Sequence, residues 1–160
     1  MATNMFITIG DIRGDSRDRM HRDEVEVLSW SWGLSNSVAA PSGGAAVGKA
    51  NFQDVTFTHV VDRASPNLML ACAAGKRFKD ARLTVRRAGP ERPQDFLVIT
   101  LQDVSVTSVQ CTGSGPESTL AEQVGLTFAS VDFEYKPQKD DGSIDDGVHF
   151  RWDLQNHSPF

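Results

Sequence analysis

The sequence has few cysteines and no long apolar run. Its 160 residues include only Cys72 and Cys111, too few and too scattered for a disulfide framework. No apolar stretch approaches the roughly 20 residues that a membrane helix requires. The N-terminal segment lacks the basic start, apolar middle and small-residue cleavage site of a secretory signal peptide. We therefore expect a chain that folds in a reducing cytosol, does not insert into a membrane and does not use the general export route.

Positive charge is also in short supply. The chain has 16 basic and 21 acidic residues, which gives a formal net charge of −5. This balance argues against general binding to nucleic acid or to anionic membranes. The apolar fraction of 39% and the charged fraction of 23% are ordinary for a soluble globular protein. The length favours a single domain, which we expect to cover residues 1–160.

Residue patterns typical of metal sites and catalysis are missing too. A catalytic thiol at Cys72 would need an activating neighbour that the sequence does not show. The acidic run 140–147 lacks the final Glu and the flanking helices of an EF-hand, so it is interpreted as a turn before the last strand. Four histidines stand in no paired ligand spacing: His21, His59, His149 and His157. We expect no enzyme activity, no cofactor and no metal.

One segment comes close to a nucleotide-binding motif. Residues 43–50 match G-x-x-x-x-G-K through Gly48 and Lys49, but Ala50 replaces the Ser or Thr whose hydroxyl binds magnesium. A phosphate-binding loop should also open a helix, whereas residues 51–57 alternate like a strand. We therefore interpret the segment as a glycine-rich loop that joins two strands.

Most of the chain shows strand patterns. Apolar and polar residues alternate in several stretches separated by turn residues, which predicts a mainly β fold: a small antiparallel β-barrel of two packed sheets, with one flanking helix and a long extended loop at about 34–50. A C-terminal turn and strand are expected over 137–160. The predicted strands fall within these ranges: 24–33, 51–61, 82–88, 96–110, 124–135 and 148–154.

One helix is predicted over residues 65–75. Ser65 is expected as its N-cap, Pro66 as its first residue, and Gly75 as the left-handed residue that ends it. Its small and apolar residues share one face that would lie close against a sheet: Leu68, Ala71, Cys72 and Gly75.

The apolar residues of three strands change parity partway along. Val25 and Val27 are apolar at odd positions, whereas Trp30 and Trp32 are apolar at even ones. Similar switches occur in 97–106 and 124–135. Because side chains alternate faces along a strand, each switch means either a bend or bulge, or burial on both faces by the core and a neighbouring subunit.

The ordered set of short motifs resembles the haemolysin-coregulated protein (Hcp) family, the tube subunits of bacterial type VI secretion. The segment 24–33, EVEVLSWSWG, carries the most distinctive match, although 45–47 departs from the family's usual glycine run. Further matches run in order along the chain: Gln53-Asp54, 61–66, 70–72, 83–86, 99–104, 113–115, 135–139 and Trp152.

The resemblance implies a small β-barrel flanked by one helix, six copies of which form a ring with an open lumen. Stacked rings would form a tube that a contractile sheath expels with a spike at its tip and small effector proteins in its lumen. The subunit would be cytoplasmic when assembled and then secreted to the medium or into a target cell. No fused toxin domain is expected after Trp152. The alternative from another class is a monomeric ligand-binding β-barrel, which would need an apolar cavity.

Two sets of site residues follow from this reading. Ser29 and Ser31 are predicted to face the lumen and contact effectors, whereas Trp30 and Trp32 would pack in the core with Leu68 and Cys72. The loop is predicted to contact the next ring through the following residues: Pro41, Gly43, Gly44, Gly48 and Lys49.

Overall fold

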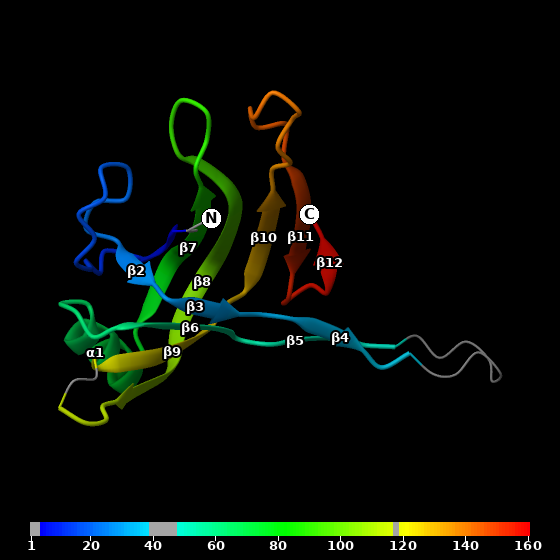
Figure 1. Cartoon of the computed structure of the whole chain (residues 1–160). Helices are drawn as coiled ribbons and strands as arrows, with labels where there is room; N and C mark the ends of the chain where they lie inside the picture. The colour runs from blue at the N-terminus through cyan, green and yellow to red at the C-terminus, as the bar shows by residue number, and fades with distance from the viewer. Residues whose placement is uncertain (1–3, 39–47, 117–118) are drawn as a thin grey trace.

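The computed structural model describes residues 4–38, 48–116 and 119–160. The mainly β, antiparallel fold predicted from the sequence is confirmed, with a single helix in the described part (Figure 1). No helix there is long and apolar enough to cross a membrane. The elements are β1 Asn4–Ile9, β2 Val25–Val27, β3 Ser29–Ser31, β4 Leu34–Asn36, β5 Ala50–Phe52, β6 Val55–Val60, α1 Ser65–Ala74, β7 Arg77–Arg87, β8 Gln94–Thr112, β9 Ala121–Thr127, β10 Ser130–Tyr135, β11 Val148–Asp153 and β12 Ser158–Pro159.

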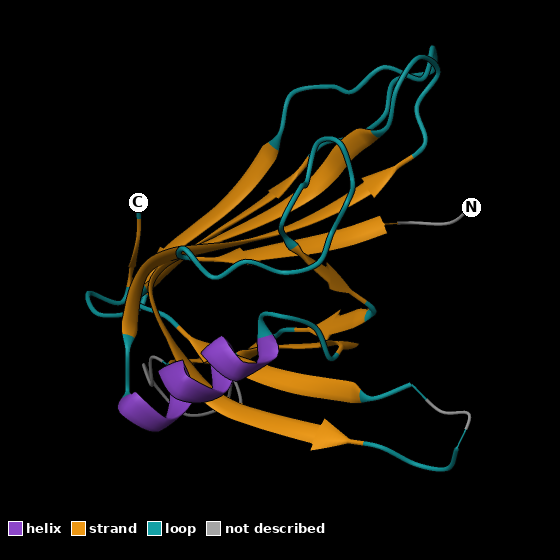
Figure 2. Ribbon diagram, turned by 90° about the vertical axis from the view of Figure 1, so that its left-hand side faces the viewer, coloured by secondary structure: helices purple, strands orange, loops and turns teal. Residues whose placement is uncertain are grey.

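Ten of the strands form one sheet that folds over into two layers. The first layer runs in the order β12-β11-β10-β8-β7-β1-β2. The second layer consists of β3, β6, β9 and the C-terminal part of β8, which pair in that order. Strand β8 is long enough to serve both layers, which diverge from it in Figure 2. Strands β4 and β5 pair only with each other in the described part and form a separate ribbon.

The three parity switches are bends at which the chain passes from one layer to the other. Leu28 separates β2, which pairs with β1, from β3, which pairs with β6. In β8 the switch falls at Asp103, whose φ of 59° lies in the left-handed region, and a register shift follows between Val106 and Ser108. The third switch coincides with the break between β9 and β10. These patterns therefore reflect bends of the sheet.

The core lies between the two layers. Its fully buried members include Phe57, Ile99 and Leu126. Helix α1 packs against this core through Leu68 and Ala71. Of the residues predicted for the core, Leu68 is fully buried, whereas three are half-buried and contact the cluster from its margin: Trp30, Trp32 and Cys72.

The helix begins differently from the prediction. Ala64 is the N-cap, so the assignment of Ser65 as the cap is wrong, and Pro66 is the second helical residue. The reason is a tight turn in which Asp62 Oδ1 accepts from the Ala64 N–H at 2.8 Å and Ser65 Oγ accepts from the Asp62 N–H at 3.1 Å. The predicted end is confirmed, because Gly75 adopts φ 65°. Gly75 is exposed, however, and is not part of the packed face.

A charged loop, residues 13–24, is tied to the strands by ion pairs. Arg86 of β7 donates to both carboxylate oxygens of Asp18, with Nη1 2.7 Å from Oδ1. Arg63 donates through Nε to the Gly14 carbonyl. At Gly14 a Cβ would lie 2.5 Å from the Glu24 carbonyl oxygen, so no larger residue fits there without a backbone shift.

The Asp18–Arg86 pair predicts a specific pH dependence of stability. Hydrogen bonding to Arg86 lowers the pKa of Asp18 from 3.8 to about 2. A carboxylate whose pKa is depressed in the folded state stabilises the fold above its unfolded pKa, and this contribution is lost as the pH falls toward the folded pKa. Asp18→Asn should therefore be less stable than the wild type at pH 7, with a gap that closes as the pH falls from 3.8 to about 2.

Urea unfolding across this pH range measures the gap. Asp11→Asn, at an exposed carboxylate, is the matched control and should show no such closing gap. A stability difference between wild type and Asp18→Asn that stays constant down to pH 2 would contradict the assignment.

Candidate functional site

The outward face of the second layer carries two rows of uncharged residues, seven of the eight with a polar side chain. The strand registers place one residue from each of β3, β6, β9 and β8 in each row, so their side chains point to the same side of the sheet. We call this surface the neutral face. Its first row is Ser29, Thr58, Gln123 and Gln110; its second row is Ser31, Thr56, Gly125 and Ser108.

A third row of residues lies between the two rows of the neutral face. Its side chains are apolar and point to the opposite side of the sheet. Trp30, Phe57, Val124 and Val109 pair across the same four strands and contact the core. Ser29 and Ser31 are exposed and lie opposite the tryptophans, as the alternation predicts. The sequence identified only these two serines. The other six members of the neutral face depend on the strand registers, which no local pattern gives.

The absence of a side chain at Gly125 keeps the neutral face from protruding at this position. A Cβ at this position would lie 2.6 Å from Ser108 Oγ and 2.9 Å from Thr107 Oγ1. These hydroxyls come close because β8 bulges here, and Thr107 Oγ1 donates to Asp54 Oδ2 at 2.9 Å. Any side chain at 125 would have to displace them and would rise above the surface.

The second layer ends in an open strand edge on each side. In the described part of the chain, β3 pairs only with β6, and residues 106–112 of β8 pair only with β9. Both edges therefore present backbone N–H and C=O groups to the surroundings. Such edges can pair with another chain.

Strands β4 and β5 continue β3 and β6 beyond the body as a two-stranded ribbon, which we call the arm (Figure 1). Leu34 and Val38 on the arm are 50% and 71% exposed. A Cβ on Gly48 would collide with the Asn36 side chain and lie 2.8 Å from the Ser37 backbone, so glycine permits the close approach of the two chains. Because Gly48 and Lys49 lead into a strand, the local structure is not that of a phosphate-binding loop. Pro41, Gly43 and Gly44 lie outside the described residues.

Aromatic rings join the root of the arm to the first layer. Trp32 donates through Nε1 to the Gln53 carbonyl at 3.1 Å. Phe52 of β5 stacks on Trp152 and Phe150 of β11, with ring centroids 6.0 and 6.4 Å apart. The two tryptophans of this group are half-buried because they fill the margin between the layers instead of its centre.

A buried pair of ionisable side chains crosses the second layer. His59 and Glu122 are both fully buried, and His59 Nε2 lies 2.8 Å from Glu122 Oε1. The Cys111 thiol donates to Glu122 Oε2 at 3.1 Å, and this bond raises the pKa of the thiol. The carboxylate stands between the thiol and the imidazole, so this group cannot activate Cys111 as a nucleophile. Sequence patterns gave no sign of this pair, because its members lie 63 residues apart.

Two of the other histidines also contact carboxylates. His149 of β11 lies between Asp132 and Glu134 of β10, at 2.8 and 3.1 Å, on the outward face of the first layer. His21 lies 2.8 Å from Glu24. No set of three or more potential ligands in the described residues could hold a metal ion. The first layer is thus charged on its outward face, in contrast to the neutral face of the second.

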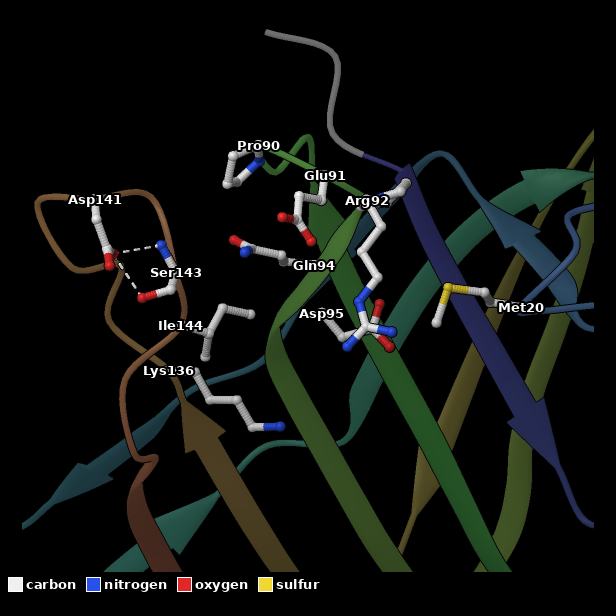
Figure 3. Close-up of a pocket in the computed structure, with 11 residues that line it drawn as sticks. Met20, Pro90, Glu91, Arg92, Gln94, Asp95, Lys136, Asp141, Ser143 and Ile144 are labelled. Carbon is white, nitrogen blue, oxygen red and sulfur yellow. Dashed lines mark hydrogen bonds between the residues drawn. The ribbon is translucent and has the colours of Figure 1, made fainter.

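A groove of about 700 Å³ lies at one end of the first layer (Figure 3). The β7–β8 turn forms one wall and the turn between β10 and β11 forms the other. Its lining mixes Arg92 and Lys136 with Glu91, Asp95 and Asp141. Asp141 accepts from the Ser143 N–H and hydroxyl, which lowers the pKa of its carboxyl. The groove is open and charged, unlike the apolar cavity that a ligand-binding barrel needs.

This arrangement of two β layers, one covering helix and a projecting ribbon is shared with type VI secretion proteins of known structure. A solved structure described as a type six secretion system protein superposes with a TM-score of 0.91 at 27% identity, over 98% of this chain and 99% of that one. Hcp1 from Salmonella typhimurium superposes with a TM-score of 0.83 at 32% identity over the whole of both chains.

Sequence comparison identifies the family. The family model "Type VI secretion system effector, Hcp" matches residues 6–135. Protein hcp1 of Pseudomonas aeruginosa is 47% identical over 159 residues, which cover 98% of each chain. The chain therefore belongs to the Hcp family, whose members are secreted structural proteins of the type VI system and not a family of enzymes.

Proposed function

We propose that this chain is the structural subunit of a type VI secretion tube, in which six copies close into a ring and rings stack. The observation that carries the proposal is the neutral face between two open strand edges. A ring needs two different edges on each subunit, and pairing the β3 edge of one copy with the β8 edge of the next would satisfy both. Light scattering tests the ring, which should have six times the mass of the chain.

The neutral face is the surface we assign to the lumen. Ser29 and Ser31 lie in it with six other uncharged residues, so a ring would enclose a wide, wet channel. The charged outward face of the first layer, with Asp132 and His149, would then form the exterior. Small effector proteins would travel in the lumen, a spike would sit at the tip, and a contractile sheath would surround and expel the tube. The subunit would assemble in the cytoplasm and then reach the medium or a target cell.

The arm is the part that we assign to stacking. It stands clear of the body and exposes apolar residues at Leu34 and Val38. Deleting residues 41–47, which lie in the sequence between β4 and β5, should leave single rings intact and weaken their association into tubes, because the deletion leaves the strands of both layers unchanged. Sedimentation velocity and negative-stain microscopy of the two proteins measure ring and tube separately. Tubes of wild-type length from the deletion variant would refute the stacking role.

The alternative function, that of a monomeric ligand-binding barrel, is favoured by no observation. The space between the layers is filled by core side chains such as Leu101 and Val104.

A further inference from the structure

An exposed apolar corner lies at the end of β3 and β6 that is remote from the arm. Leu28, just before β3, is 57% exposed, and Val60, the last residue of β6, is 39% exposed. The Leu28 N–H donates to the Thr58 carbonyl at 2.8 Å, which fixes the two chain segments next to each other. Both side chains are therefore held in place at the surface instead of in the core.

A hollow of about 280 Å³ adjoins this corner and carries acidic residues. Leu28 and Val60 line it together with the carboxylates of Asp15, Glu26 and Asp62. Asp15 lies 3.4 Å from Arg63, and Asp62 lies 3.8 Å from the buried His59. Glu26 is exposed and forms no ion pair with any described residue, so its charge is available to a partner.

The arm has the complementary chemistry. Lys49 is the single charged residue between Gly33 and Gln53. It is exposed, and within the described part of the chain its ammonium group has no carboxylate partner. Leu34 and Val38 supply exposed apolar side chains on the same ribbon. The arm, with one cationic residue and exposed apolar ones, therefore complements the apolar corner and the unpaired carboxylate of Glu26 beside it.

The two features lie at opposite ends of the same strands. The arm continues β3 and β6 outward from one end, and the corner stands at the other end of both strands (Figure 1). A copy therefore cannot fold its own arm onto its own corner without reversing the ribbon. A second copy placed head to tail can reach it, and every copy offers one arm and one corner, as a heterologous contact requires.

We propose that the arm of one copy docks on the Leu28–Val60 corner of a second copy, with Lys49 beside Glu26. The proposal rests on the proposed stacking role of the arm and names the surface that receives it. Apolar contact would supply affinity, and the Lys49–Glu26 pair would set the register of one copy on the other.

Charge exchange tests the contact. Glu26→Lys and Lys49→Glu should each leave rings intact and reduce stacking by about tenfold, since each places like charges in the contact and a tenfold change corresponds to about 1.4 kcal/mol. The double variant Glu26→Lys/Lys49→Glu should restore stacking to near the wild-type level. Sedimentation velocity at several protein concentrations separates rings from stacked rings. The matched controls are Glu91→Lys and Lys79→Glu, exposed residues remote from both features, which should stack normally.

Three results would contradict the proposal. Single variants that stack like the wild type would overturn the contact, and so would a double variant no better than the single ones. If wild-type rings stack and one of these two results is found for the variants, only this inference is contradicted. Wild-type rings that never associate would instead contradict the proposed stacking function and this inference with it.

Discussion

Replacing His59 with leucine is expected to lower the free energy of unfolding by about 3–5 kcal/mol, because it leaves the fully buried Glu122 carboxyl group with only the Cys111 thiol as a hydrogen-bond partner. Both residues are fully buried, so solvent cannot replace the lost imidazole. Urea unfolding at pH 7 measures the loss. The contact lies inside the second layer, away from the neutral face and the arm, so the effect should appear in the stability of the subunit.

A double replacement serves as the control. His59→Leu/Glu122→Leu removes both buried polar side chains and should recover most of the stability, since apolar residues of similar volume often replace a buried pair at little cost. A loss below about 1 kcal/mol for His59→Leu alone would show that the buried pair is not what holds these strands together.

A charge at Ser31 is expected to abolish effector transport while the ring still forms. In a ring, Ser31→Glu would place one carboxylate from every copy at the same level of the channel. Acidic groups on a cargo protein would be repelled by these carboxylates, and uncharged groups would leave the carboxylates unpaired. Co-purification of effector should therefore fall by about tenfold or more. Ser31 is exposed on the neutral face, so the subunit itself should fold normally.

Measuring effector co-purification and ring assembly separately distinguishes a loss of cargo binding from a folding defect. The matched control is Gln102→Glu, an exposed residue on the first layer, which should carry effector like the wild type. An unfolded subunit, either for Ser31→Glu or for the neutral variant Ser31→Gln, would show that Ser31 faces the protein interior. Normal cargo in a folded Ser31→Glu ring would place the neutral face outside the lumen.

Local patterns predicted the fold class and several details of it. Gly75 was expected to end the helix, and it does so with a left-handed backbone. The parity switches marked where the sheet bends, although alternation alone could not distinguish a bend from burial against a neighbour. The register of β8 and the positive φ of Asp103 make that distinction.

Features that depend on distant residues could not be predicted. Ser65 suits an N-cap by type, but its hydroxyl accepts from the N–H of Asp62, which precedes the helix. Trp30 and Trp32 are apolar enough for the core but lie at its margin. The His59–Glu122 pair and most of the neutral face arise from strand pairing, which a single sequence does not contain.

Negative-stain microscopy of the purified protein tests the central claim most directly. We expect closed rings with six equal subunits and an open lumen, because β3 of one copy and β8 of the next would complete each other's edges. Ser31→Glu should give the same rings. A protein that remains a monomer at high concentration, with no ring in the images, would contradict the assignment as a tube subunit.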